Sequence, residues 1–148
     1  MSSKPEFCFI TDKKQKRKMV AEFSKFFHNR SLSKRDIDIL ADKIAENAFV
    51  LAAVAGSENI GFVGYYCNDT ESLTAYLSVV IMNPRYRGMG TGTAMLKEVF
   101  RDCAERGYKT VRLEVDNENT GAIKLYKTLG FRKEKESSDN SAFYCMTL

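Results

Sequence analysis

Three glycines at alternate positions, Gly88, Gly90 and Gly92, are the feature that most constrains how this chain can fold. They follow an extended apolar run, Leu73–Met82. Pro84 ends that run, because proline cannot donate a hydrogen bond within a sheet. Apolar residues at helical spacing follow the glycines. We therefore expect a strand, a glycine-rich loop and the start of a helix in direct succession.

This glycine-rich loop has the properties of an anion site. Glycines leave the backbone free to turn successive N–H groups toward one anion. The start of the helix adds about half a positive charge, and Arg85 and Arg87 precede the glycines. The segment therefore predicts a site for a phosphate or diphosphate group, and a plain glycine-rich turn is the alternative.

Two common phosphate-binding motifs do not fit the loop. A P-loop needs a Lys followed by Ser or Thr after its glycines, and none follows here. A dinucleotide fold needs G-x-G-x-x-G directly after its first strand, whereas residues 83–87 separate these glycines from the strand. Asp116 imitates the ribose-binding acid of that fold, but the chain has too few βα units. We expect neither nucleotide triphosphate hydrolysis nor dinucleotide binding.

The remaining patterns complete one mixed α/β domain. Ser33 and Asp36 form an approximate capping box before a second helix, and Gly130 ends a short one. The pattern predicts a single domain, 1–148, that is antiparallel in its first half and β–α–β in its second. The expected strands are 6–11, 49–55, 60–67, 73–82, 110–115 and one or two within 131–148, and the expected helices cover about 13–27, 34–48, 93–106 and 120–129.

Composition narrows the classes of protein that this chain can represent. It is 44% hydrophobic and 28% charged, as expected of a globular protein. Its longest run without a polar residue, 48–56, is too short to span a bilayer, and its start lacks a signal-peptide pattern. We therefore expect a cytoplasmic protein with no membrane partner. Residues 1–35 carry ten Lys or Arg and three Asp or Glu, which indicates a solvated helix face or a basic lip for an anionic ligand or nucleic acid.

The cysteines and the single histidine do not form a metal motif. Cys8, Cys67, Cys103 and Cys145 are widely spaced, without a C-x-x-C pair, and His28 is the one imidazole. A structural zinc site needs clustered ligands, so we expect no metal. We interpret the cysteines as small buried apolar residues and His28 as a surface or capping residue.

Two blocks of this sequence resemble the GNAT superfamily of acyl-CoA-dependent N-acetyltransferases. Residues 87–92, Arg-Gly-Met-Gly-Thr-Gly, match the loop Q/R-x-x-G-x-G/A of that family. Residues 119–131 match its second signature, N-x-x-A-x-x-L-Y-x-x-x-G-F, and follow a Leu-Glu-Val strand at 113–115. The resemblance is specific over Leu73–Phe131 and is only topological before it.

The resemblance implies a mostly antiparallel central sheet, flanked by helices, that splays at the strand before the loop. The free edge of that strand would pair with the pantetheine arm of acetyl-CoA like an added strand. The loop amides would bind the diphosphate of this co-substrate, and an asparagine would contact it from the other side of the splay. The implied cofactor-binding residues are Val80, Ile81, Met82, Arg87, Gly88, Met89, Gly90, Thr91, Gly92, Thr93 and Asn119.

The resemblance also implies two catalytic residues. Acetyl transfer needs an amine without its extra proton, and an alkylammonium has a pKa of about 10.4. It also needs a polarised thioester and a stabilised thiolate leaving group. Glu114 would serve as the base, directly or through water, and Tyr126, twelve residues later, as the acid that faces the sulfur. Alternatively, Glu114 is a solvated or salt-bridged strand residue and Tyr126 packs in the core.

We expect this chain to transfer an acetyl group from acetyl-CoA to a primary amine of a small molecule or peptide. We expect the amine to attack directly in a ternary complex. A non-catalytic acyl-CoA-binding regulatory module is one alternative, and acetylation of a nucleic-acid-linked amine is another. Nucleic acid is not the expected partner, because only the basic N-terminal segment favours it. The first two helices and the following hairpin carry no motif, so the acceptor stays open, and a homodimer formed through sheet edges is compatible with the sequence.

Overall fold

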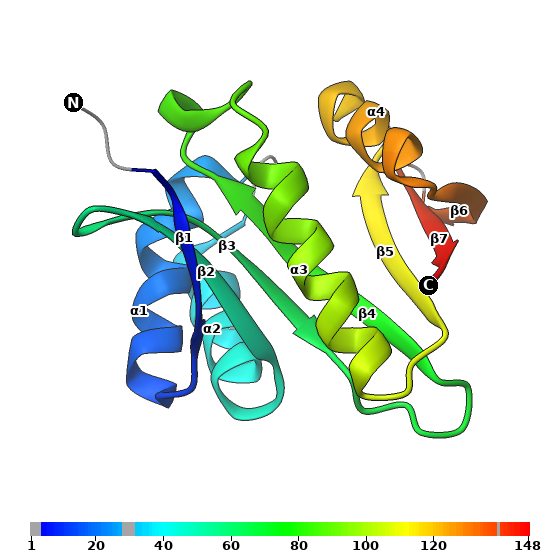
Figure 1. The fold of residues 1–148 in the computed structure, drawn as a ribbon, viewed down its shortest axis with the longest axis horizontal. Coiled ribbons are helices and arrows are strands. Elements are labelled where there is room, and N and C mark those ends of the chain that lie inside the picture. The colour runs from blue at the N-terminus through cyan, green and yellow to red at the C-terminus, as the bar shows by residue number, and fades with distance from the viewer. Residues whose placement is uncertain (1–3, 28–31, 139) are drawn as a thin grey trace.

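The computed structural model describes residues 4–27, 32–138 and 140–148, and its centre is one seven-stranded sheet in the order β1-β2-β3-β4-β5-β7-β6 (Figure 1). The strands are β1 (Glu6–Ile10), β2 (Phe49–Ala55), β3 (Glu58–Tyr66), β4 (Thr74–Met82), β5 (Thr110–Asp116), β6 (Arg132–Ser138) and β7 (Ser141–Thr147). The helices are α1 (Lys13–Phe23), α2 (Lys34–Asn47), α3 (Thr91–Glu105) and α4 (Thr120–Leu129), with short 3₁₀ turns η1 (Ser24–Phe26) and η2 (Pro84–Tyr86).

The first four strands form the antiparallel half of the sheet, as predicted. The predicted capping box opens α2, where Ser33 Oγ accepts a hydrogen bond from the Asp36 amide at 3.1 Å and the Asp36 carboxylate accepts one from the Ser33 amide at 2.9 Å. The first helix is shorter than predicted, because α1 ends at Phe23 and a 3₁₀ turn follows it.

The second half of the sheet contains the predicted β–α–β unit. Strands β4 and β5 are parallel and α3 connects them, and the last segment is a pair, because β6 and β7 form an antiparallel hairpin. Gly107 after α3 and Gly130 after α4 have φ of +90° and +113°. These left-handed conformations explain why glycine ends both helices.

Two apolar layers hold the helices to the sheet. Val20 and Ile44, from α1 and α2, pack with Phe62 of β3. Leu96 of α3 and Tyr126 of α4 belong to the other layer. The layer beneath α1 and α2 includes residues of β1 to β4 and none from the described parts of β5, β6 or β7. One face of the last three strands therefore lacks a covering helix.

The structure corrects our interpretation of the cysteines. Cys103 is buried, but Cys8 is exposed and Cys67 and Cys145 are half-buried. His28 lies outside the described residues. Among the residues described, no helix is both long enough and apolar enough to cross a membrane.

Candidate active site

The parallel strands β4 and β5 separate halfway along their length. They pair only where Thr74–Leu77 faces Thr110–Leu113. Beyond those residues β4 continues to Met82 and β5 to Asp116, and within the described chain neither gains a partner on the side facing the other. Figure 1 shows the two strands diverging toward the end of the molecule where α3 and α4 begin. This is the splay that the family resemblance implied.

A β-bulge lies where the separation begins. Leu77 and Val79 pair with consecutive residues of β3, which leaves Ser78 between them as an extra residue. An extra residue bends a strand and increases its local twist. It also changes which side chains share a face, so that Leu77 and Val80 lie in one core layer and Val79 in the other. The sequence pattern alone did not predict this bulge.

The end of β4 offers a free backbone edge. Val80, Ile81 and Met82 are half-buried there, and their other edge pairs with β3. Extended ligands add to such edges through main-chain hydrogen bonds. The three residues that we predicted for the pantetheine arm therefore lie where an added strand could pair.

The loop after β4 is held to the neighbouring strand β3. The Asn83 amide donates to the Ile60 carbonyl at 2.8 Å. The Asn83 side chain accepts from the Arg85 amide at 3.0 Å and so caps the turn η2. The Tyr86 hydroxyl donates to a Glu58 carboxylate oxygen at 2.7 Å. These contacts fix the position from which the glycine-rich loop starts.

Two of the three glycines are required by backbone conformation. Gly88 and Gly90 have φ of +79° and +78°, where a residue with a side chain is strained. Gly92 instead lies in the first turn of α3 without a positive φ, and a Cβ there would meet nothing within 4 Å. Gly92 is therefore not required by its backbone conformation, and its predicted contact with the cofactor stays a prediction.

Helix α3 begins without a side-chain cap, whereas Asp12, Ser33 and Asn119 cap the other three α-helices. Its N-cap is Gly90, so the amides of the first turn keep their hydrogen-bonding capacity for an anion. Arg87 is exposed and forms no ion pair within the part of the chain that the structure describes. Loop and helix start together form an open, positively polarised site.

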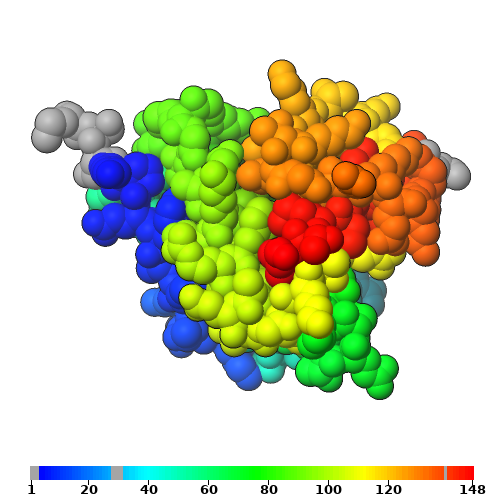
Figure 2. All heavy atoms as spheres, turned by 45° about the vertical axis from the view of Figure 1, so that its right-hand side comes forward, coloured from blue at the N-terminus to red at the C-terminus, as the bar shows by residue number. Residues whose placement is uncertain are grey.

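The other predicted loop residues differ in exposure. Met89 is 60% exposed, Thr91 is 6% exposed and Thr93 is half-buried. Asn119 caps α4 by accepting a long hydrogen bond, 3.4 Å, from the Ala122 amide. The loop and α4 lie at the same end of the molecule, as Figures 1 and 2 both show in green and orange.

Tyr126 lies on α4 with its ring buried. It is 7% exposed and packs edge-on against Phe131, with ring centroids 5.5 Å apart. Its hydroxyl forms no hydrogen bond with any described residue. Among the described residues, Arg112 Nε is the one side-chain nitrogen or oxygen that is both fully buried and without a hydrogen bond, so the Tyr126 oxygen is not fully buried. The phenol oxygen therefore keeps some access to solvent. Burial raises the pKa of Tyr126 to about 12.

Glu114 is the first residue of β5 beyond its pairing with β4. It is exposed while Leu113 and Val115 are buried, because successive side chains of a strand point to opposite faces of the sheet. Ser137 Oγ, from β6, donates to Glu114 Oε2 at 2.6 Å. The sequence analysis missed this partner, because β6 is exposed along its whole length and shows no alternating pattern.

Other polar and aromatic side chains share the uncovered face of β5, β7 and β6 with Glu114. The Arg112 guanidinium lies 3.8 Å from the ring centroid of Phe143 and pairs with Glu134 at 2.9 Å. Burial, and then the charge of Glu114, raises the pKa of Tyr76. Glu114 and Tyr126 thus lie on opposite faces of the sheet, and no hydrogen bond joins them.

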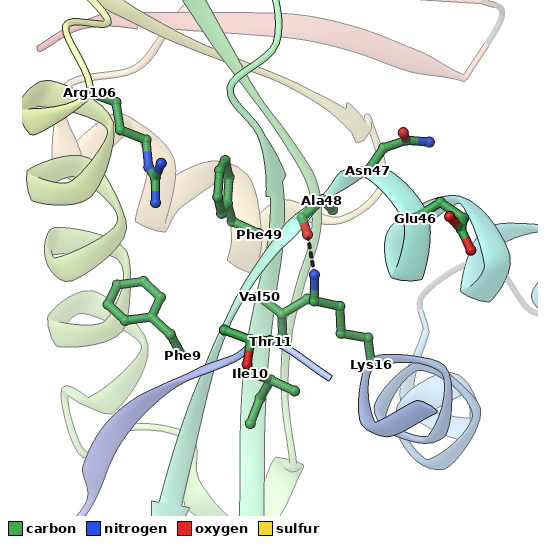
Figure 3. A pocket seen from close by; sticks show the side chains of 10 residues that line it. All are labelled: Phe9, Ile10, Thr11, Lys16, Glu46, Asn47, Ala48, Phe49, Val50 and Arg106. Atoms are coloured by element: carbon green, nitrogen blue, oxygen red, sulfur yellow. Dashed lines mark hydrogen bonds between the residues drawn. The ribbon is translucent and has the colours of Figure 1, made fainter. Parts of the chain in front are cut away.

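A cavity of about 390 Å³ lies elsewhere, between β1, β2, α1 and the end of α2 (Figure 3). Lys16 Nζ enters it and donates to the Ala48 carbonyl at 2.8 Å. Arg106, just after α3, also lines it. The fifteen residues of α3 span about 22 Å, so this cavity is separate from the glycine-rich loop.

Some basic side chains of the N-terminal segment form ion pairs within the fold. Lys13 of α1 pairs with Glu46 of α2 at 2.8 Å, and Arg17 pairs with Asp42 at 3.1 Å. These cations stabilise the contact between the two helices. They are correspondingly less available to attract an anionic ligand.

The family model "Acetyltransferase (GNAT) family" matches residues 16–131. The chain belongs to this family. It is 33% identical over 118 residues to an N-acetyltransferase of Methanocaldococcus jannaschii, covering 77% of this chain and 51%, about half, of that protein. It is 32% identical over 130 residues to the thialysine N-epsilon-acetyltransferase of Mus musculus, covering 80% and 75%.

Solved structures of GNAT proteins share the fold. A GNAT acetyltransferase of Staphylococcus aureus superimposes with a TM-score of 0.80 at 19% identity, covering 97% of this chain and 99% of that one. PaiA N-acetyltransferase of Thermoplasma acidophilum, solved with coenzyme A, gives 0.74 at 17% identity, with the same coverage of both chains. The family model and the two N-acetyltransferase relatives support acetyl transfer from acetyl-CoA to an amine. No group of three or more potential metal ligands occurs in the described ranges.

Proposed function

We propose that this chain transfers an acetyl group from acetyl-CoA to a primary amine of a small molecule or peptide, by direct attack in a ternary complex. The observation that carries the proposal is the splay between β4 and β5 beside the uncapped start of α3. The splay provides a slot for an extended pantetheine arm, and the helix start provides amides for a diphosphate.

In this proposal the cofactor lies along β4 and ends at the loop. The backbone of Val80, Ile81 and Met82 pairs with the pantetheine amides, and residues Gly88 to Thr93 bind the diphosphate. Arg87 adds a cation that forms no ion pair with any described residue. Asn119, at the start of α4, contacts the cofactor from the opposite side of the splay.

Tyr126 acts on the leaving group as a hydrogen-bond donor. Its pKa of about 12 keeps the phenol protonated at neutral pH. A thiol has a pKa of about 8.5, so complete proton transfer from this phenol to the thiolate is uphill by about 3.5 pKa units, or about 5 kcal/mol. Tyr126 therefore stabilises the departing thiolate without giving up its proton, and the thiolate takes a proton from solvent.

Glu114 takes the proton that the amine must lose, directly or through one water. It stands at the mouth of the splay on the uncovered face, where an acceptor can approach. The hydrogen bond from Ser137 restrains one carboxylate oxygen and thereby orients the group. The alternative for Glu114 is a purely structural link between β5 and β6.

The acceptor class follows from the relatives only in outline. One relative is named for the ε-amine of thialysine, which favours a lysine-like small molecule here. A peptide α-amine is the second candidate. In this proposal either acceptor approaches over the face of β5, β7 and β6, which the α1 and α2 layer does not cover.

The test is a thiol-release assay with acetyl-CoA and a panel of lysine analogues, polyamines, amino sugars and peptides. Tyr126→Phe should lower kcat more than tenfold with little change in KM for acetyl-CoA, and Glu114→Gln should lower it in a pH-dependent manner. Tyr108→Phe and Glu71→Gln, a buried tyrosine and an exposed glutamate away from the splay, are the matched controls. Acetyl-CoA binding without turnover on any amine would instead favour a regulatory binding module.

The proposal treats residues 1–148 as one catalytic domain in the cytoplasm. A single continuous sheet supports the first statement, and free cysteines are typical of a reducing compartment. A homodimer would use the exposed edges β1 or β6, and sedimentation velocity of the purified chain decides between monomer and dimer.

A further inference from the structure

Two cysteines meet in a region that the proposed reaction does not use. The Sγ atoms of Cys67 and Cys103 lie 3.7 Å apart, although 36 residues separate them in the chain. Cys67 directly follows β3 and is half-buried, whereas Cys103 is fully buried on α3. Cys8 and Cys145 make no sulfur contact within the described residues. The fold therefore brings together one specific pair of the four thiols.

A polar network surrounds this pair at the end of α3. Asp102 Oδ2 accepts hydrogen bonds from the Tyr65 hydroxyl at 2.7 Å and from Arg106 Nε at 2.9 Å. The Arg106 guanidinium also lies 3.7 Å from the ring centroid of Phe49, and Figure 3 shows both side chains. The network holds the end of α3 against β2 and β3, and it compensates the charge of Asp102 with two donors.

The two thiols are chemically different. The hydrogen bond between the two sulfur atoms lowers the pKa of Cys67, and the charge of Arg106 lowers it further, while burial and the charge of Asp102 oppose both. The same hydrogen bond and burial raise the pKa of Cys103. Thiolate character is therefore concentrated on Cys67, which is also the more exposed sulfur residue of the two.

We propose that Cys67 and Cys103 form a redox modification site, at which a hydroperoxide converts the two thiols reversibly into a disulfide. Cys67 is the attacking cysteine and Cys103 the resolving cysteine. No cluster of three potential metal ligands includes them in the described part of the chain, so the geometry favours dithiol chemistry over metal binding.

The chemistry balances with one hydroperoxide per disulfide. The Cys67 thiolate attacks the outer peroxide oxygen, an S–O bond forms as the O–O bond breaks, and the released alkoxide takes a proton to become an alcohol, or water when the oxidant is hydrogen peroxide. Cys67 is now a sulfenic acid. The Cys103 sulfur, after losing its proton, attacks the Cys67 sulfur, and hydroxide leaves with that proton as water. Two thiols are oxidised and the peroxide is reduced.

Formation of the bond requires a small movement with a measurable consequence. The sulfur atoms must approach from 3.7 Å to about 2.05 Å. The disulfide would then fasten α3 to the end of β3 and close a 36-residue loop. Restricting the unfolded chain over such a loop should raise Tm by about 5–10 °C.

The experiment uses the full chain with Cys8→Ser and Cys145→Ser, which leaves only the proposed pair. One to five equivalents of hydrogen peroxide should remove 2 Da, give a non-reducing peptide map that links Cys67 to Cys103, and raise Tm. Dithiothreitol should reverse all three changes. In Cys103→Ala, dimedone should label Cys67 as a sulfenic acid. Cys67→Ser provides a second variant on the more exposed residue, in which Cys103 should remain reduced.

Several results would overturn the proposal. Persistence of two free thiols at these peroxide levels would do so, as would a disulfide between two chains in place of the internal one. The assigned roles would be wrong if dimedone labelled Cys103 in the Cys67→Ser variant as fast as it labels Cys67 in the Cys103→Ala variant. None of these readouts depends on acetyltransferase activity, so they are independent of the proposed function.

Discussion

Replacing Gly92 by alanine separates what this residue does for folding from what it does for binding. Gly92 lies in the first turn of α3 without a positive φ, and an added Cβ has no atom within 4 Å. Alanine favours a helix over glycine by about 1 kcal/mol at an interior position, and we take about half of that for the first turn. The variant should therefore gain about 0.5 kcal/mol in free energy of unfolding and about 1–2 °C in Tm.

The same methyl group should leave acetyl-CoA binding intact. The loop pattern Q/R-x-x-G-x-G/A accepts glycine or alanine at the position of Gly92, and a Cβ there meets no atom within 4 Å. In the proposed complex the diphosphate is bound by backbone amides, which alanine also provides. The expected result is a Kd for acetyl-CoA within twofold of the original, in a protein that is slightly more stable.

Titration calorimetry with acetyl-CoA and a thermal melt of the free protein measure the two effects. Gly121→Ala is the matched control, because Gly121 is the second residue of α4 and also has open space around its Cβ. It should gain the same stability and keep the original affinity. A Kd that rises more than tenfold in Gly92→Ala, with the Kd of Gly121→Ala unchanged, would refute the reasoning that this turn binds the diphosphate through its backbone amides.

Further predictions concern stability. Gly61→Ala should lower the free energy of unfolding by about 1–3 kcal/mol, because its Cβ would lie 2.7 Å from the Ile81 carbonyl oxygen; a urea titration that shows no loss would contradict that contact. Ser33→Ala should cost about 1 kcal/mol through loss of the cap on α2, measured in the same way, and an unchanged midpoint would mean that the cap contributes nothing. Since burial raises the pKa of Tyr126 from 10 to about 12, the folded state prefers the neutral phenol, and the free energy of unfolding should fall by up to about 3 kcal/mol as pH rises from 10 through 12. Alkaline denaturation of Tyr126→Phe should lack this component, and identical curves for the two proteins would argue against it.

The sequence predicted those parts of the fold that depend on neighbouring residues. The capping box at Ser33 and the glycines that end α3 and α4 are local signals, and the structure confirms them. The alternation of buried and exposed residues along β5 is likewise a local property of a strand. Strand β4 and the loop to α3 were also identified, because proline and glycine restrict the backbone directly.

The parts that could not be predicted depend on contacts between distant segments. The bulge at Ser78 exists only relative to the register of β3. Ser137 reaches Glu114 through a strand without any hydrophobic alternation. The approach of Cys67 to Cys103 requires the packing of α3 on the sheet. None of these leaves a periodic signal in the chain.

The gap in the sheet has a thermodynamic consequence. The free edge of β4 presents backbone groups to this gap, and the extended arm of the co-substrate could form hydrogen bonds with them. Occupancy would complete the hydrogen bonding that the chain leaves unfinished, so the folded state gains free energy as ligand is added. At one hundred times Kd the gain amounts to about 2.7 kcal/mol. The protein with acetyl-CoA bound would therefore resist unfolding more than the same polypeptide without it.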